Sequence, residues 1–163
     1  MTTPTPTPTT ALARRWKMDI NMGTDETPDW QPMIAITEFQ PTFPPNIEEA
    51  STYDSEGWAE NEKTAQSWEV ATTFNRRIND QSKVYNDVHE AIRQAAFAYG
   101  SAARVHLRFY DRNGLPEAYE GRALAEWEDQ GGEYNALGQV SVTFTGDGKL
   151  ELIDNPLAEP ETP

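Results

Sequence analysis

The side chains best suited to chemistry in this sequence are two histidines, a dense set of carboxylates and several isolated aromatic rings. His89 and His106 have no second histidine at metal-ligand spacing, because "VHEAI" lacks the final His of an H-E-x-x-H motif. "DRNG", residues 111–114, starts like a calcium loop but reaches its glycine two positions too early. We therefore expect two solvent-facing histidines, a turn at "DRNG", no metal ion and no cofactor.

The carboxylates and aromatic rings do not define an enzyme. Glu48 or Glu49 with Asp54 could in principle form a glycosidase pair, but among 27 acidic residues some pair always falls close in sequence. Trp58 has the flat ring of a sugar-stacking platform, which leaves a carbohydrate-binding β-sandwich module open as an alternative. A lone aromatic more often anchors its loop or an interface. Motifs for a nucleophile elbow, a P-loop or a dinucleotide site are also missing from the sequence, so we expect no enzymatic activity.

Composition and charge narrow the function classes further. The chain has 163 residues, enough for one domain with a sizeable core, and it contains no cysteine for disulfides or thiolate metal sites. Thirteen Lys and Arg against 27 Asp and Glu give a formal net charge of −14. This charge argues against a conventional nucleic-acid binder and against anionic membranes, and no apolar stretch is long enough to span a bilayer.

Alternating apolar residues dominate the sequence between two polar ends. "MTTPTPTPTT" predicts a flexible Thr/Pro arm over residues 1–13, and residues 154–163 are interpreted as a second flexible tail. Residues 14–153 form a single predicted domain of about seven antiparallel strands, with one helix over 84–99 and a hairpin turn at Asp147-Gly148. The sequence therefore predicts a mainly β fold: an antiparallel β-sandwich or barrel-like domain with one flanking α-helix.

A long segment without regular periodicity interrupts this pattern. Residues 41–66 are polar, acidic and marked by proline, with lone aromatic residues at Phe43, Tyr53 and Trp58. A structureless loop of this length inside a small domain is normally either functional or disordered. We expect this loop to have a function.

The order of these features resembles the major tail tube proteins of long, non-contractile phage tails. The resemblance rests on "YDSEGW" followed by "SWEV", and on the closing "TFTGDGKL", within residues 14–153. It implies a structural virion protein whose hexameric rings stack into a tube, assembled in the host cytoplasm, through which DNA passes without specific binding. The implied partners are further copies of the chain and the tape-measure, tail-tip and tail-terminator proteins. Tail-terminator and head-tail connector proteins share related folds and remain alternatives.

The resemblance also gives the long loop a role, namely contact with the adjacent ring. The candidates for inter-ring stacking are Phe43, Tyr53, Asp54, Glu56 and Trp58. Carboxylates on the polar strand faces would repel DNA from the lumen wall and let it slide. The lumen-facing candidates are Asp19, Glu69, Glu117, Glu126 and Glu128. Lys17, Arg104, Arg108 and Arg122 share such faces, so a uniformly acidic wall is a hypothesis.

Overall fold

The computed structural model describes residues 4–5 and 7–158; the outer parts of both predicted terminal arms lie outside this range. Within it the chain forms twelve strands and one α-helix, which confirms the predicted mainly β fold class. The strands are β1 (Trp16–Asn21), β2 (Trp30–Pro32), β3 (Ile36–Thr42), β4 (Pro45–Glu49), β5 (Asn61–Gln66), β6 (Glu69–Asn75), β7 (Ile78–Asn79), β8 (Val84–Tyr85), β9 (Arg104–Asp111), β10 (Ala118–Asp129), β11 (Gln139–Gly146) and β12 (Glu151–Leu152). The helix α1 spans Asp87–Phe97, and short 3-10 turns occupy Ala13–Arg15, Tyr53–Ser55 and Gly100–Ala103.

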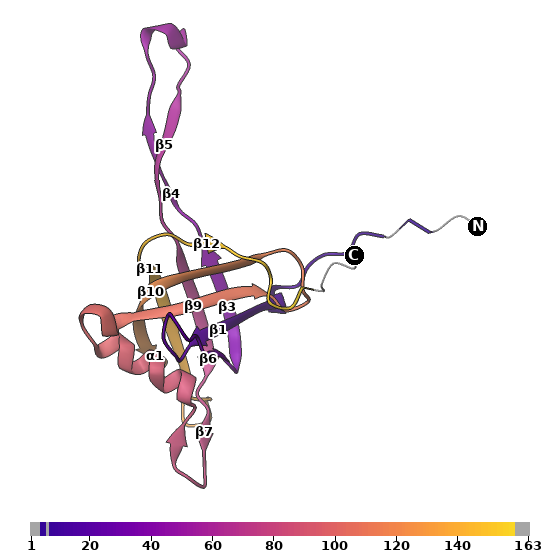
Figure 1. Ribbon diagram of the computed structural model, residues 1–163, viewed down its shortest axis with the longest axis vertical. Coiled ribbons are helices and arrows are strands. Elements are labelled where there is room, and N and C mark those ends of the chain that lie inside the picture. The colour runs from indigo at the N-terminus through magenta and orange to yellow at the C-terminus, as the bar shows by residue number, and fades with distance from the viewer. Residues whose placement is uncertain (1–3, 6, 159–163) are drawn as a thin grey trace.

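One antiparallel sheet makes the body of the described domain. Its order is β2-β1-β9-β10-β11-β6-β3, with β12 added alongside β10. The sheet rolls over on itself, so that its last strand meets strands near its first edge. Phe39 of β3 contacts both Trp16 of β1 and Phe109 of β9, with ring centroids 5.7 and 5.6 Å apart. The result is a barrel-like sandwich, from which two separate hairpins project at opposite ends of the longest axis (Figure 1).

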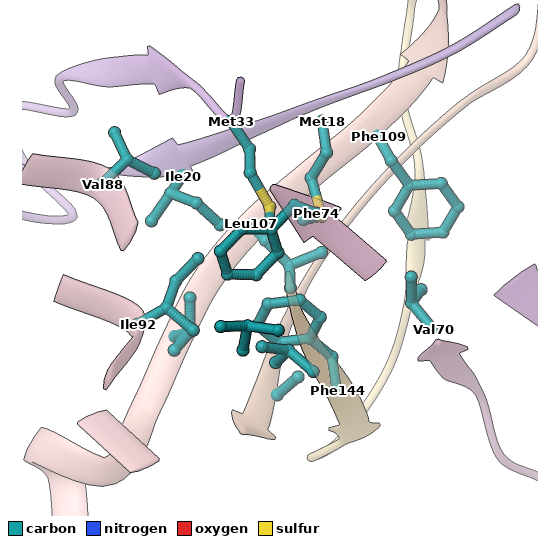
Figure 2. Close-up of a cluster of buried hydrophobic side chains, with 14 of the residues drawn as sticks. Met18, Ile20, Met33, Val70, Phe74, Val88, Ile92, Leu107, Phe109 and Phe144 are labelled. Carbon is teal, nitrogen blue, oxygen red and sulfur yellow. The ribbon is translucent and has the colours of Figure 1, made fainter. Parts of the chain in front are cut away.

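The hydrophobic core fills the inside of this roll. Alternate residues of the strands point inward, as the period-two pattern predicts. Figure 2 shows side chains from β1, β6, β9 and β11 meeting those of α1. Met18, Phe74, Leu107, Phe109 and Phe144 are all fully buried. The opposite faces of the same strands carry polar and charged side chains, so one sheet supplies both a dry interior and a polar exterior.

Helix α1 lies against β9 and β10 and closes one side of the core. Asn86 caps it, since its side-chain oxygen accepts hydrogen bonds from the backbone N–H groups of Val88 and His89 at 3.1 and 3.3 Å. The helix is shorter than the predicted 84–99 segment. Val84 lies in β8, where it pairs with Asn79 of β7, so these residues continue a hairpin instead of starting the helix.

Three further expectations are corrected by the structure. Residues 41–66 are not structureless, because β3 continues to Thr42 and β4 then pairs with β5. The Asp147-Gly148 turn does not form the predicted hairpin, because the strand after it, β12, does not pair with β11. It pairs instead with the first half of β10, an edge that the shorter β11 leaves open. The tail is held at its start, since the buried Asn155 side chain donates to the carbonyls of Asp111 and Leu115 at 2.8 and 2.7 Å.

Candidate assembly surfaces

The most prominent feature outside the core is the β4–β5 hairpin, here called the arm (residues 45–66). The arm extends from one end of the molecule, as the long continuation of β3 and β6 (Figure 1). Every residue of β4 and β5 is exposed. A two-stranded ribbon without a third strand or a packed face is at best marginally stable in water, so the arm gains little stability from contacts within its own subunit.

The base of the arm is firmly fixed to the domain. Both the backbone N–H and the hydroxyl of Ser67 donate to the carbonyl of Pro44, at 3.1 and 3.0 Å. Next to it Trp68 is buried, and its indole Nε1 donates to Gly148 O at 3.1 Å. The ring lies directly on Gly146, where a Cβ atom would come within 2.4 Å of it. This close contact requires glycine at position 146 and fixes the Trp68 ring beside the base of the arm.

The tip of the arm is a compact, hydrogen-bonded turn. Thr52 and Ser55 form a reciprocal capping box, and the N–H of Trp58 donates to Ser55 O at 2.9 Å. Glu56 adopts a left-handed conformation with φ of 52°, followed by Gly57 with φ of 85°. The turn therefore has a definite shape, with Ser55 buried inside it and the rings of Tyr53 and Trp58 exposed.

The predicted stacking residues fall into two places on this arm. Tyr53, Asp54, Glu56 and Trp58 lie together at the tip, and the rings of Tyr53 and Trp58 are 106% and 79% exposed. Phe43 lies instead at the base, half-exposed, with its ring centroid 5.3 Å from that of Tyr119. Between residues 45 and 66 the arm carries six acidic residues and one lysine, which gives a net charge of −5. The tip is thus both acidic and aromatic.

A second, shorter hairpin projects at the opposite end of the molecule (Figure 1). Here β7 and β8 pair as Ile78 with Tyr85 and Asn79 with Val84, and the apolar side chains are 63%, 46% and 52% exposed for Ile78, Tyr85 and Val84. The sequence analysis missed this hairpin, because it placed Val84 and Tyr85 at the start of the predicted helix. The available signal was short: Ile78 before and Val84 and Tyr85 after the four-residue turn 80–83.

The polar face of β1, β9 and β10 is occupied by ion pairs. Arg108 lies 2.9 Å from Asp19, which also accepts a hydrogen bond from the Tyr110 hydroxyl at 2.8 Å. Burial, and then the hydrogen bond to Asp19, raise the pKa of Tyr110, so this phenol stays protonated and donates. Asp19 is itself only 4% exposed. The carboxylate of Asp19 therefore binds Arg108 and Tyr110 within the subunit and is not free to face solvent.

Other cations on this face are also paired. Arg104 pairs with Asp147, and Arg122 lies 2.5 Å from Asp25, which lowers the pKa of Asp25. His106 is partly buried and its Nε2 lies 2.8 Å from a carboxylate oxygen of Glu120.

The outer face of β6, β10 and β11 is different, because its carboxylates are not paired. Glu69, Glu126 and Glu128 are exposed, and no cation of the described residues forms an ion pair with them. The register places Glu126 beside Thr143 and Glu128 beside Ser141 of β11. The structure thus brings three of the five lumen-facing candidates onto one hydroxyl-rich face. Glu117 lies apart from them, half-buried and 2.9 Å from Arg15.

His89 does not face solvent, contrary to the expectation from the sequence. It is fully buried under α1, where its ring packs on Phe74 with centroids 4.2 Å apart and Nε2 lies 3.1 Å from Ile34 O. Burial disfavours the imidazolium form and lowers the pKa of His89. The expectation that His89 faces solvent is therefore wrong, and His89 is a buried residue of the core.

Within residues 4–5 and 7–158, no group of three His, Cys, Asp or Glu side chains is placed to hold a metal ion. In the same residues no helix is long and apolar enough to cross a membrane.

Comparisons with known proteins define the class of fold. No family model matches the sequence, and no curated protein sequence matches it significantly. Solved structures do match over most of the domain, and they come from tail-like assemblies. A chain in the tail of an empty gene transfer agent particle, refined with helical and C6 symmetry, has a TM-score of 0.68 at 12% identity, over 88% of this chain and 99% of that one.

Two further structures agree. A chain in the virion of a native gene transfer agent particle has a TM-score of 0.67 at 11% identity, over 88% of this chain and 99% of that one. A chain in the sixfold-symmetrised baseplate of the anti-feeding prophage has a TM-score of 0.59 at 9% identity, over 89% and 97%. This chain therefore has the fold found in components of gene transfer agent tails and of a prophage baseplate.

Proposed function

We propose that the protein is a structural subunit of a phage-like tail tube. Its copies form hexameric rings, and the rings stack into a conduit for DNA. The observation that carries the proposal is a tail-type fold with a fixed, fully exposed acidic arm that has nothing to pack against within its own subunit. Structures with this fold come from assemblies of C6 or sixfold symmetry, which supports a ring of six.

In this proposal the arm makes the contact between rings. The side chains at the tip, chiefly Tyr53 and Trp58, become buried against the next ring, while Asp54 and Glu56 find charged partners there. Phe43 supports the base of the arm, where it already contacts Tyr119. Large exposed aromatic rings that cluster at one point are the side chains most often responsible for binding energy at interfaces.

The lumen wall is assigned to the outer face of β6, β10 and β11. Its free carboxylates, Glu69, Glu126 and Glu128, repel phosphate, and its Ser and Thr hydroxyl groups keep it wet. DNA then slides through without specific contacts. The remaining partners follow from the position of a tube in a virion tail: a tape-measure protein inside, a tail-tip complex at one end and a terminator at the other.

Electron microscopy of the purified, concentrated protein at low and high salt tests the proposal. We expect hollow tubes of stacked rings, with faster growth at high salt, because the net charge of −14 repels subunits and salt screens it over about 10 Å at 0.1 M. Deleting residues 45–62 should leave rings or monomers. Single rings that never stack would instead identify a terminator or connector, and monomers under every condition would contradict the proposal.

A further inference from the structure

The two projecting hairpins lie at opposite ends of the molecule and differ in charge. The arm leaves one end of the long axis, and the β7–β8 hairpin leaves the other (Figure 1). Residues 76–85 carry Arg76, Arg77 and Lys83 against Asp80, a net charge of +2 in a chain whose total is −14. The arm carries −5. The most acidic projection and a locally basic one therefore point in opposite directions.

Two of the three cations at the β7–β8 end are available to a partner. Arg76 is engaged within the subunit, where it pairs with Glu90 and stacks on Tyr85 at 3.9 Å. Arg77 and Lys83 are exposed, and neither forms an ion pair with any carboxylate of the described residues. The protein is strongly acidic, yet these two cations at a projecting tip have no ion-pair partner within the described residues. They are therefore suited to bind an acidic surface on another molecule.

A groove of mixed polarity accompanies these cations. It has a volume of about 360 Å³ beside the hairpin, and apolar side chains of Ile34, Ile78, Val84 and Tyr85 line it together with the polar residues Arg77, Asn79, Asn86 and Asp87. Three of these apolar side chains are at least 46% exposed on the free subunit. The tip of the arm offers the matching elements, namely the exposed rings of Tyr53 and Trp58 flanked by carboxylates.

We propose that the arm of one copy docks on the β7–β8 hairpin of a second copy in the next ring, with Trp58 in the groove, Tyr53 beside it and arm carboxylates on Arg77 and Lys83. This inference rests on the proposed stacking of rings and names the surface that receives the arm. A contact between unlike ends of identical subunits does not close on itself, so it repeats from ring to ring without limit. Such a head-to-tail contact is what growth of a tube requires.

Cross-linking between singly substituted chains tests the contact, because the natural chain contains no cysteine. Ala59→Cys at the arm tip and Gln81→Cys at the β7–β8 turn are both exposed positions. An equal mixture of the two variants is assembled and treated with a short bismaleimide. A third variant, Ser101→Cys, replaces Gln81→Cys in the control mixture, since Ser101 is equally exposed but lies on the turn after α1.

We expect tubes whose Ala59–Gln81 mixture gives a cross-linked dimer of the two variants, and whose Ala59–Ser101 mixture gives at least about tenfold less. Tubes that form normally but lack the Ala59–Gln81 cross-link would overturn this inference and leave the proposed function intact. Failure of the unsubstituted protein to form rings or tubes would overturn both.

Charge reversal provides a second test that separates position from net charge. Arg77→Glu with Lys83→Glu should raise the critical concentration for tube growth about tenfold, because two attractions become repulsions. The control, Arg14→Glu with Lys149→Glu, makes the same change in net charge at two exposed positions away from the hairpin. Adding Glu56→Lys and Glu60→Lys to the first variant should restore growth. Equal effects of both double variants, or no rescue, would contradict the docking.

Discussion

Replacing Trp58 by alanine should weaken the assembly of rings into tubes while leaving the stability of the folded monomer almost unchanged. The ring is 79% exposed at the tip of the arm, and its backbone turn is held by Ser55 and Gly57 without help from the indole. Removing it therefore changes the free energy of unfolding of the monomer by less than about 0.5 kcal/mol, as expected for an exposed position. The effect on ring stacking should be much larger.

The size of that effect follows from the area that stacking would cover. Burying most of an exposed tryptophan removes about 150–200 Å² from water, which corresponds to about 4–5 kcal/mol at 25 cal/mol per Å². Ordering of the arm and imperfect packing offset part of this, so about 2–3 kcal/mol per contact is expected, the usual size for an interface aromatic. The association constant of each arm contact should therefore fall about 30-fold to 150-fold, and stacking of whole rings, which uses several such contacts, should weaken by more.

Two measurements on the same preparation check this prediction. Urea unfolding of the dilute monomer gives its stability, and sedimentation of tubes across a concentration series gives the critical concentration. Phe97→Ala is the matched control, since Phe97 is 71% exposed but lies on α1. A Trp58→Ala protein that forms tubes at the normal concentration would refute the role of the arm tip. A protein that unfolds much more easily would refute the claim that Trp58 has no structural role in the subunit.

Three further outcomes follow from features of the domain. The free energy of unfolding should be greatest above about pH 6.5 and should fall below it, because the unfolded chain protonates His89 near its ordinary pKa whereas the buried ring resists protonation. Urea unfolding across pH 5–8 should therefore show a weaker pH dependence for His89→Gln than for the natural protein. Gly146→Ala should cost about 1–3 kcal/mol and change tryptophan fluorescence, because the added Cβ meets the ring of Trp68; an unchanged unfolding midpoint would show that the ring moves freely. Glu126→Lys with Glu128→Lys should slow DNA release from intact particles, and an unchanged release rate would contradict the lumen assignment.

The fold class could be predicted from the sequence because alternation records one buried and one polar sheet face. The same alternation cannot say which strands pair. The turn at Asp147-Gly148 looks like a hairpin turn, yet Leu152 pairs with Tyr119 of β10, because β10 and β6 already occupy both edges of β11 and the first half of β10 has a free edge. His89 follows Val88 directly on the helix and is a polar residue type, but both side chains are buried beneath α1.

The arm shows a different limit of sequence reasoning. Its strands bury nothing within the subunit, so the segment lacks the apolar alternation by which strands are recognised. Backbone pairing and short polar contacts, such as the 2.6 Å hydrogen bond from Asn46 to Thr64, shape it instead. The β7–β8 hairpin escaped notice because each of its strands has two residues. In both cases the strands are exposed and bury no apolar face within the subunit, and a buried face is what sequence alternation records.

Strand β6 has a mechanical consequence for a tube built in this way. It is the seven-residue stretch of chain that leads from the arm to the β7–β8 hairpin, and it lies between β3 and β11 as an interior strand. If the two hairpins are the axial contacts, a pull along the tail passes from ring to ring through this covalent backbone. The hydrogen bonds that hold β6 lie across the strand, so they are loaded together in shear and do not open one at a time. Rings joined through such a strand can bend against one another while each subunit resists stretching.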